Sequence, residues 1–371
     1  MTAEFFAQLS RDPDVEAPDL VAVDATDRLL LDEAAELIRG CGPGEVAVVD
    51  DSYGALTLGA VALHGAADVR VHQDLLVAEH ALARNAGRLG LVGTYRATGL
   101  DGALAAGARI VLVKAPKALE ALREVAEVAA AAAPPDVTVL VGGRIKHMTH
   151  AMNDVLRRSF DDVSATLARQ KSRVLVARGP RPAPSSFPRC QEHPGLIVCA
   201  HGAAFAGTKL DLGSRALLRE LPRMAPAART ALDLGCGTGV LAAALAKDRP
   251  GLSVLATDQS AAAVASAAAT AAANCLADRI RVFRDDAAAT VPDGSVDLVV
   301  CNPPFHVGAA VVTSAADRLF AAAGRVLRPG GALWTVFNSP LTHPAALRRL
   351  VGPTRVVARD RRFSIAVSTR S

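Results

Sequence analysis

The sequence predicts an α/β protein with two tandem domains, each a doubly wound, mostly parallel sheet covered by helices. Short runs rich in valine, leucine and isoleucine alternate with longer alanine-rich or leucine-rich stretches along the 371-residue chain, which is the pattern of βαβ units. The same order of features occurs twice, as an old duplication would leave it. A chain of this length has room for two domains of ordinary size.

A proline-rich segment divides the two halves. Residues 178–189 contain four prolines, a density that neither a helix nor a central strand tolerates. We therefore expect a first domain over residues 1–182 and a second domain over residues 183–371.

The composition predicts a folded protein outside the membrane. Hydrophobic residues make up 51% of the chain and charged residues 21%, which is enough apolar material for a core in each half. No apolar run approaches the roughly 18–20 residues that cross a bilayer, and the N-terminus lacks the features of a secretion signal. We therefore expect a cytoplasmic protein. The sequence leaves the oligomeric state open, with a monomer slightly favoured.

The six cysteines are scattered along the chain. They form no Cys-x-x-Cys pair, and no histidines lie near them at zinc-ligand spacing. We expect reduced thiols, as in most cytosolic proteins, and no metal site.

The repeated features can be paired from the first strand of each half onward. In the first half, the expected strands with polar residues at their ends span residues 46–50, 69–74 and 110–114. Their counterparts in the second half span residues 230–233, 253–258 and 298–302. In both halves a helix follows the first strand after a short turn. The order of elements is repeated, but the residues at the strand ends differ.

The turn after the first strand of the second half has the features of a nucleotide site. Gly235, Gly237 and Gly239 follow Asp233, and glycines there let the backbone approach a ligand. The N-terminus of the next helix favours a carboxylate of the ligand. Asp258 ends the following strand, where an acid accepts hydrogen bonds from both ribose hydroxyls. The spacing also fits a dinucleotide site.

The turn sequence Asp-Leu-Gly-Cys-Gly-Thr-Gly closely resembles the cofactor motif of class I methyltransferases. The resemblance implies Rossmann-like methyltransferase domains and S-adenosylmethionine as the cofactor, bound by Asp233, the three glycines and Asp258. It also implies that Asp286, after the third strand, lies beside the adenine ring. The alternative is that Asp285 and Asp286 are solvated loop acids.

An apolar strand ends abruptly at Asn302, Pro303, Pro304 and Phe305, because proline cannot donate to a β-ladder and fixes φ. The prolines would hold the Asn302 amide and the next carbonyls in a rigid cup at the carboxyl edge of the sheet. Such a cup suits a planar nitrogen on a conjugated ring, whose N–H groups must be held by acceptors before it attacks a methyl group. Asn302 Oδ1 and the Pro303 carbonyl are the expected acceptors, Phe305 would stack on the ring, and Asn302 would also contact the cofactor. The alternative is a strand-ending turn with a core phenylalanine.

His306 follows this motif and is a candidate base. Methyl transfer to a neutral amine needs little base help, because the nitrogen becomes very acidic once it has attacked. We therefore expect His306 to position the substrate. A neutral leaving group also requires no metal.

The Asn-Pro-Pro-Phe pattern is similar to that of class I methyltransferases acting on exocyclic amines of bases and on glutamine amides. The Asn-Pro-Pro-Phe-His form, the altered first half and residues 205–213 resemble the bacterial ribosomal RNA guanine-N2 methyltransferases, over almost the whole chain. Residues 50–56, 146–149 and 167–176 resemble the large-subunit (23S) enzymes more than the small-subunit (16S) ones. The resemblance implies methylation of a guanine N2 amine in ribosomal RNA, with Phe205 and His306 near the substrate.

The first half differs at the matched positions. Ser52 and Leu56 replace glycines, and Lys114 and Ala115 replace the Asn-Pro pair. Without the glycines the backbone cannot approach a cofactor, and Lys114 would oppose the positive sulfonium. We therefore expect this half to have lost S-adenosylmethionine and to grip the substrate.

The end of the first half is strongly basic. Residues 144–189 hold ten lysines or arginines against three acids, a net charge of +7, whereas the whole chain is +4. Basic surface holds RNA phosphates, and A-form RNA is recognised largely by shape and backbone. Lys146, Arg157, Arg158 and Lys171 are the candidates for binding ribosomal RNA. The alternative is a solvated charged helix face.

Three other functions stay open. A methyltransferase for a protein glutamine or a small molecule would share the fold and use the first half for dimerisation. A non-catalytic RNA-binding scaffold would not need the glycine turn and the Asn-Pro-Pro-Phe motif, yet both are intact. A nicotinamide dehydrogenase is disfavoured, because no base and substrate-binding pair follows the glycine turn.

Overall fold

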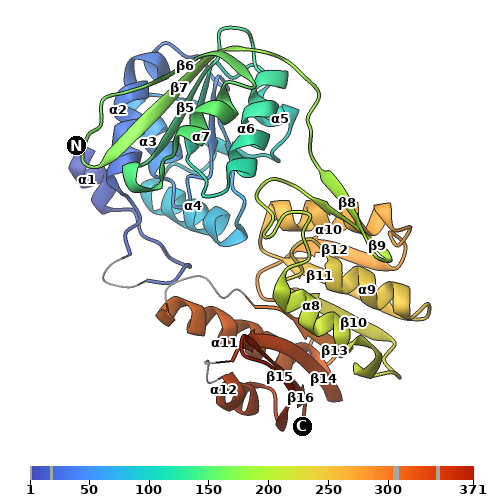
Figure 1. Cartoon of the computed structure of the whole chain (residues 1–371). Coiled ribbons are helices and arrows are strands. Elements are labelled where there is room, and N and C mark those ends of the chain that lie inside the picture. The colour runs from blue at the N-terminus through green and yellow to red at the C-terminus, as the bar shows by residue number, and fades with distance from the viewer. Residues whose placement is uncertain (1, 17–19, 304–308, 340–342) are drawn as a thin grey trace. The chain divides into compact units, whose positions relative to one another are not determined.

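The structure, a computed structural model, describes residues 2–16, 20–303, 309–339 and 343–371. The chain divides into two compact units, Met1–Phe187 and Pro188–Ser371 (Figure 1). Within the described ranges, no helix is both long and apolar enough to cross a membrane.

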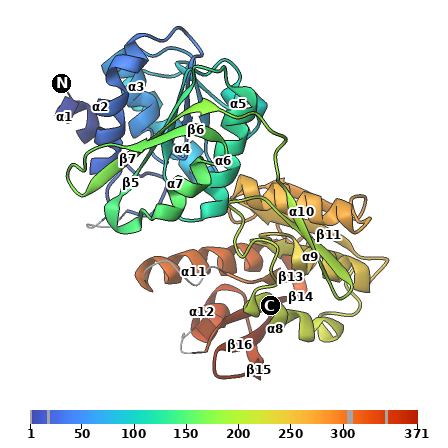
Figure 2. The same ribbon diagram turned by 45° about the horizontal axis from the view of Figure 1, so that its top comes forward.

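The first unit is built on a seven-stranded sheet in the order β3-β2-β1-β4-β5-β7-β6. Figure 2 labels the last three of these strands, β5, β7 and β6. The strands from β3 to β5 are parallel, and β7 is antiparallel to both β5 and β6. The strands are β1 (Val46–Val49), β2 (Val69–His72), β3 (Tyr95–Ala97), β4 (Ile110–Lys114), β5 (Thr138–Arg144), β6 (Phe160–Ala165) and β7 (Ser172–Pro180). The helices are α1 (Thr2–Ala7), α2 (Ala25–Arg39), α3 (Ala55–His64), α4 (Leu76–Leu89), α5 (Gly102–Ala105), α6 (Leu119–Ala132), the 3-10 turn η1 (Ile145–His147) and α7 (His150–Leu156).

Alternate residues of the central strands face two separate cores. In β1, Val46 and Val48 pack with side chains of α2, α3 and α4, whereas Ala47 and Val49 pack with those of α5, α6 and α7. Successive side chains of a strand point to opposite faces, so a strand covered by helices on both sides is apolar throughout. The predicted α/β class is confirmed.

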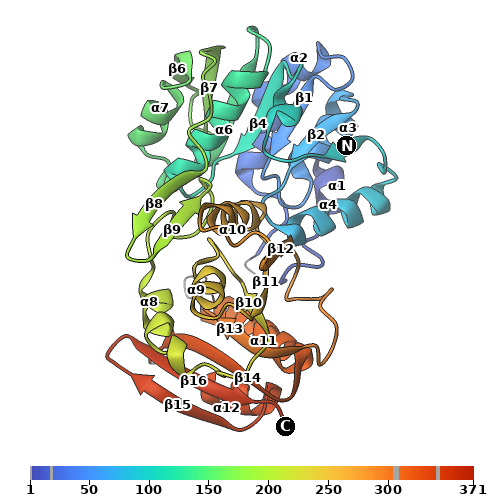
Figure 3. The ribbon, with the colours of Figure 1, turned by 90° about the vertical axis from the view of Figure 1, so that its right-hand side faces the viewer.

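The second unit repeats this architecture, with the order β12-β11-β10-β13-β14-β16-β15 (Figure 3). The five strands from β12 to β14 in this order are parallel to one another, and β16 is antiparallel to β14 and β15. The strands of this sheet are β10 (Thr230–Leu234), β11 (Ser253–Asp258), β12 (Ile280–Arg284), β13 (Val296–Cys301), β14 (Leu327–Asn338), β15 (Thr354–Arg359) and β16 (Phe363–Thr369). The helices are α8 (Leu212–Arg219), the 3-10 turn η2 (Leu221–Arg223), α9 (Val240–Asp248), α10 (Ala261–Ala273), α11 (Ala309–Val326) and α12 (His343–Leu350).

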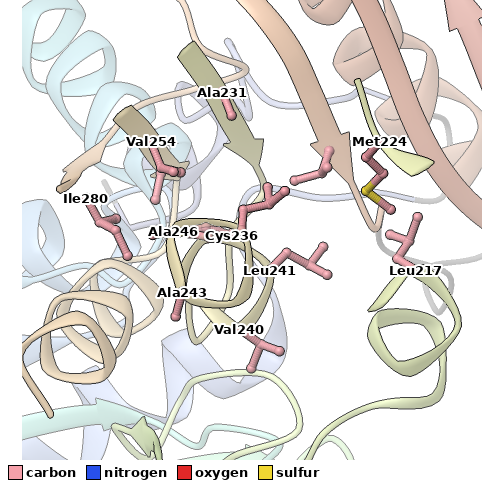
Figure 4. Close-up of a cluster of buried hydrophobic side chains, with 14 of the residues drawn as sticks. Leu217, Met224, Ala231, Cys236, Val240, Leu241, Ala243, Ala246, Val254 and Ile280 are labelled. Carbon is pink, nitrogen blue, oxygen red and sulfur yellow. The ribbon is translucent and has the colours of Figure 1, made fainter. Parts of the chain in front are cut away.

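Two cores again lie on the two faces of the sheet. Figure 4 shows part of one of them, in which Leu217 of α8 and Leu241 of α9 pack with Met224 and with side chains of β10 and β11. Phe320 of α11 belongs to the other core, which also holds side chains of α12. This packing fixes the N-terminus of α8 beside the carboxyl end of β13, where the candidate site lies.

A separate hairpin opens the second unit, formed by β8 (Arg189–His193) and β9 (Leu196–Ala200). β9 runs along α10, where Thr270 Oγ1 accepts from Cys199 N and Asn274 Oδ1 accepts from Ile197 N, both at 3.0 Å. Residues four apart lie on one face of a helix, so these side chains satisfy alternate amides of the strand as a neighbouring strand would.

The expectation of reduced thiols is wrong for one pair of cysteines. Cys190 and Cys199 face each other across the hairpin, with Cα atoms 4.0 Å apart, and form a disulfide. The pairing depends on the register of the hairpin, which cysteine spacing alone does not reveal.

The proline-rich segment also begins later than expected. Residues 178–180 belong to β7, where Pro180 pairs with Phe160 of β6. The pairing of β7 with β5 stops at Ala177, so β7 is an edge strand at this end and tolerates a terminal proline.

Candidate active site

Three residues with positive φ form the turn between β10 and α9. Gly235, Gly237 and Gly239 have φ values of +74°, +52° and +74°, a region that favours glycine. A Cβ on Gly235 or Gly237 would meet nothing within 4 Å, whereas a Cβ on Gly239 would lie 2.9 Å from Ala267 of α10. The first two glycines therefore leave open space beside the turn, and the third allows the close packing of α9 on α10.

Asp258 holds this turn from the end of β11. Its Oδ2 accepts from Gly237 N and its Oδ1 accepts from Ser260 N, both at 3.0 Å. Asp258 thus joins the turn after β10 to the start of α10, since Ser260 is the N-cap of that helix.

Asp233 lies beneath the turn and is 1% exposed. Its Oδ2 accepts from Ala242 N at 2.9 Å, while its Oδ1 has no hydrogen-bond partner in the described part of the chain. Burial raises the pKa of Asp233 to about 7, and the nearby Asp258 carboxylate adds to the effect. A buried, half-satisfied carboxyl group of this kind is typical of a functional site.

The carboxyl end of β13 places Asn302 against the N-terminus of α8. Asn302 Nδ2 donates to Asp211 Oδ1 at 3.1 Å and to Ser214 Oγ at 3.2 Å. The Oδ1 atom of Asn302 is buried and finds no partner among the described residues. Gly213 makes room for this amide, because a Cβ there would lie 2.7 Å from Asn302 Oδ1. The site thus offers one unpaired acceptor at the edge of the sheet.

Asp211, Gly213 and Ser214 also belong to the site. The first two fall in the stretch 205–213 that carries the family resemblance, but the sequence predicts no site role for any of the three. Asp211 is the N-cap of α8 and accepts from Gly213 N and Ser214 N at 2.9 and 3.1 Å. An aspartate two residues before a Gly-Ser pair, at the start of a leucine-rich stretch, is a recognisable cap pattern, but only the tertiary fold brings it to Asn302.

The other predicted site residues are placed differently. Asp286 forms an ion pair with Arg318 of α11, and Phe205, on the loop before α8, is 65% exposed. Pro303 is buried directly after Asn302. Pro304, Phe305 and His306 lie outside the described residues.

The strand registers fix the correspondence between the two units. Val49 pairs with Val113 as Leu234 pairs with Cys301. The residues at the ends of β4 and β13, Lys114 and Asn302, are therefore equivalent, as the sequence comparison predicts.

This register corrects the predicted match of the turns by two residues. Asp50, Ser52 and Gly54 have φ values of +58°, +63° and +92° and occupy the positions of the three glycines. Asp50 and Ser52, rather than Ser52 and Leu56, therefore replace glycines, and Gly54 is retained. The first unit keeps the backbone path of the turn but places side chains where the second unit leaves open space.

Asp258 corresponds to Gln73 and not to Asp74. The register places Gln73 one residue past β2, and its Oε1 accepts from Ser52 N at 3.0 Å. Asp74 instead donates its backbone N–H to Asp50 Oδ1 at 3.0 Å.

Lys114 is neutralised within the first unit. Its Nζ lies 3.0 Å from Asp24 Oδ1, where Asp24 is the N-cap of α2, and it also pairs with Asp27 in the first turn of that helix. Burial opposes its charge, but the Asp27 and Asp24 carboxylates raise the pKa of Lys114 above its ordinary value. The expected repulsion of a sulfonium is therefore reduced, and the altered turn and Gln73 remain as the main differences.

The four basic candidates do not come together. Lys146 and Lys171 are exposed at the carboxyl end of β5, where Ile145 N donates to Lys171 O. Arg157 and Arg158 lie just before β6, which starts at the amino end of the parallel strands. The length of β5 separates the two ends of the sheet by roughly 20 Å.

No group of three or more His, Cys, Asp or Glu side chains able to hold a metal occurs among the residues with a described position. The free thiols of Cys236 and Cys301 are buried beside the turn, and burial raises the pKa of both. They act as small apolar side chains there.

Comparison with known proteins gives the same division of the chain. Residues 195–367 match the family model of the methyltransferase small domain, and residues 2–181 match the RLMG N-terminal domain. A relative from Streptomyces coelicolor named ribosomal RNA large subunit methyltransferase G is 36% identical, with 96% of each chain covered. A relative of the same name from Pseudomonas paraeruginosa is 37% identical, with 97% of each chain covered.

A solved structure shares the fold. It is a 16S rRNA N2 methyltransferase from T. thermophilus in complex with AdoMet and guanosine, 22% identical, with a TM-score of 0.71 over the whole of both chains. The matches to both family models and the full-length relatives carry the assignment. The chain therefore belongs to the family of the ribosomal RNA large subunit methyltransferase G proteins.

Proposed function

We propose that this protein transfers a methyl group from S-adenosylmethionine to the exocyclic N2 amine of a guanine in large-subunit ribosomal RNA. The observation that carries the proposal is Asn302 Oδ1, a buried acceptor without a partner in the described structure, next to a turn with open space beside two glycines. The names of the full-length relatives support the choice of the RNA.

The residues around the turn fit the cofactor. The backbone at Gly235 and Gly237 leaves room for it, Asp258 would accept from its ribose hydroxyls, and Asp286 would lie beside its adenine. Asp233 supplies negative charge below the turn. When bound, S-adenosylmethionine supplies an electrophilic methyl group on a positively charged sulfonium.

Asn302 would prepare the amine for attack. Asn302 Oδ1 and the Pro303 carbonyl would accept hydrogen bonds from the two N–H groups of the target amine. These bonds would reduce the delocalisation of the nitrogen lone pair into the ring and direct the lone pair at the methyl carbon. A bond would form between the amine nitrogen and the methyl carbon as the bond between that carbon and sulfur breaks. The electron pair of the broken bond would stay on sulfur. The surplus proton then leaves the acidic nitrogen for water. Phe305 would stack on the guanine, and His306 would position it.

The first unit would hold the RNA rather than a cofactor. Lys146, Lys171, Arg157 and Arg158 are exposed and basic, and Phe205 of the second unit offers an exposed ring for stacking on a base. A guanine that leaves its stack can enter a site at the sheet edge. We propose that the protein works in this way in the cytoplasm, as a monomer with a gripping domain over residues 1–182 and a catalytic domain over residues 183–371.

Mass-spectrometric mapping of methylguanosines in ribosomal RNA tests the proposal. RNA from a strain that lacks this protein should miss one N2-methylguanosine in the large-subunit RNA, and the purified protein should restore it. Loss of the mark from small-subunit RNA would identify the other ribosomal RNA as the substrate. Unchanged ribosomal RNA would favour a protein glutamine or a small molecule.

A further inference from the structure

The Asn302 side chain can serve the reaction in only one of its two orientations. Its amide has an oxygen that accepts hydrogen bonds and a nitrogen that donates them, and only the oxygen can hold an N–H group of the target amine. Rotating the amide by half a turn exchanges the two atoms with almost no change of shape. A neighbouring group must therefore select the orientation.

Asp211 is such a group. Its ionised carboxylate only accepts hydrogen bonds, so the atom of Asn302 that faces Asp211 Oδ1 at 3.1 Å has to be the nitrogen. Ser214 Oγ accepts from the same nitrogen at 3.2 Å. Ser214 is 7% exposed, and the structure leaves Asn302 Oδ1 without a partner among the described residues. The two contacts fix which atom is the nitrogen and leave the oxygen beside Gly213, which has no side chain to cover it.

The surroundings would favour the opposite orientation if Asp211 were absent. Asp211 Oδ1 occupies the backbone N–H groups of Gly213 and Ser214 at the start of α8. Unoccupied amides at a helix N-terminus attract an oxygen. The Asn302 amide would then rotate and present its nitrogen to the amine, where two donors would face each other.

The first unit shows the same arrangement with a different donor. Asp24 is the N-cap of α2 and accepts from Thr26 N, as Asp211 caps α8. Its Oδ1 lies 3.0 Å from Lys114 Nζ, at the position equivalent to Asn302 Nδ2. In both units the carboxylate that caps the helix accepts a hydrogen bond from the side chain at the end of the strand. Lysine has no acceptor atom, so only asparagine can satisfy the cap and still present an oxygen.

We propose that Asp211 and Ser214 are positioning residues that hold the Asn302 amide with its oxygen toward the amine to be methylated. The proposal rests on the function proposed above, because it assigns the task of that oxygen. The orientation of the amide can nevertheless be measured without the reaction.

The test combines Asp211→Ser with Ser214→Ala in the full-length protein. Serine still caps α8, but its hydroxyl can donate as well as accept hydrogen bonds, so it no longer selects between the two orientations of the Asn302 amide. We expect kcat on ribosomal RNA to fall by about tenfold or more, with the Kd for S-adenosylmethionine unchanged within about twofold. Asp101→Ser is the matched control, because Asp101 caps α5 of the first unit through Ala103 N and should leave kcat unchanged.

Asn302→Asp separates positioning from capping. A carboxylate has two equivalent oxygens, so its orientation needs no selection. In the Asn302→Asp background the double change removes the neighbouring Asp211 carboxylate and its repulsion, so it should not lower kcat, whereas a role of Asp211 in capping alone predicts equal losses in both backgrounds. Equal losses, or no loss in either background, would overturn the proposal.

The Asn302 side-chain amide gives a readout that does not depend on turnover. Its NMR signals, assigned by their absence from Asn302→Asp, should show slow hydrogen exchange in the wild type and fast exchange after the double change. Unaltered exchange would overturn the proposal even if Asn302→Asp is inactive. If the wild type makes no N2-methylguanosine, the proposed function fails, while the exchange result still decides whether Asp211 and Ser214 hold the amide.

Discussion

Gln73 and Asp258 make the same hydrogen bond in the two units. Gln73 Oε1 accepts from Ser52 N at 3.0 Å, and Asp258 Oδ2 accepts from Gly237 N at 3.0 Å. The turn is therefore held in the same way in both units, although one carries an amide where the other has a carboxylate. The duplicated unit has kept the support of its turn and lost the acceptors that ribose hydroxyls need.

Replacing Asp258 by asparagine tests the role of the carboxylate. The amide oxygen of the new side chain would still accept from Gly237 N, so the turn should keep its shape. We expect the affinity for S-adenosylmethionine to fall about tenfold to hundredfold, as for other hydrogen bonds to a charged group, measured by calorimetry. Gln73→Ala is the comparison in the first unit and should leave the affinity unchanged. Similar losses in both variants would contradict a single cofactor site.

A methyl group on Gly237 should block the cofactor. In Gly237→Ala the Cβ enters the open space beside the turn, and a φ of +52° also strains alanine by about 1–2 kcal/mol. We expect cofactor binding to fall below detection in calorimetry, with a modest drop in the melting temperature. Ser52→Gly makes the reverse change in the first unit. It should shift stability by no more than about 1 kcal/mol and should not create a second binding site.

Asp233 should make the protein sensitive to pH near neutrality. Its pKa is raised to about 7 by burial, from an ordinary value of 3.8. The folded protein without ligand therefore binds one more proton than the unfolded chain between about pH 4 and pH 7, so this group lowers stability as pH rises through that window. Chemical unfolding of Asp233→Asn should show a flatter dependence on pH and a higher stability at pH 8.

The same carboxyl group should affect the cofactor. A positively charged ligand favours the ionised form of Asp233, so the affinity of the wild type should rise between about pH 6 and pH 8 and then level off. The affinity of Asp233→Asn should not change over this range. Equal pH profiles for both proteins would show that another group titrates.

The fold could be predicted from the sequence because its signals are local. The limits of β11 agree with the expected residues 253–258, and the apolar runs of β4 and β13 mark strands buried on both faces. The predicted alignment of the first unit's turn with the glycine turn of the second unit is wrong by two residues. In both turns the positions with positive φ recur at every second residue. A shift of two preserves that pattern, and only the strand register removes the ambiguity.

The missed parts of the site depend on contacts distant in sequence. Asp211 and Asn302 are 91 residues apart, and they meet because α8 packs beside the end of β13. The separation of Lys146 from Arg158 has the same origin, since β6 runs in the same direction as β5 and the chain returns through α7 to the amino end of the sheet between the two residues. Charge counted along the chain predicts how many basic residues there are but not where they lie.

Asn302→Ala should stop methylation without preventing cofactor binding. Loss of the acceptor for the amine is expected to lower kcat by roughly 10²–10³, in line with the removal of a preorganised hydrogen bond at a reacting group. Transfer of a labelled methyl group to ribosomal RNA measures the rate, and calorimetry measures the cofactor. Asn338→Ala, at the end of the neighbouring β14, should retain far more activity. Activity equal to wild type in Asn302→Ala would refute the proposed mechanism.

The two basic groups should contribute unequally to RNA binding. Arg157 already pairs with Asp154, whereas the ion pairs of the described residues do not include Lys146 or Lys171. The lysine pair therefore keeps its full charge for phosphates. We expect Lys146→Ala with Lys171→Ala to weaken binding and to reduce the slope of log affinity against log salt by about 0.7–0.9 for each phosphate that the variant no longer neutralises.

Filter binding to ribosomal RNA at several salt concentrations measures both quantities. Arg157→Ala with Arg158→Ala removes the same formal charge from the other end of the sheet and should change the slope less. Equal slopes for the two variants would mean that RNA binding depends on the net charge of the protein and not on where the basic residues lie. A larger effect of the arginine pair would place the RNA at the amino end of the parallel strands, because that is the end on which Arg157 and Arg158 lie.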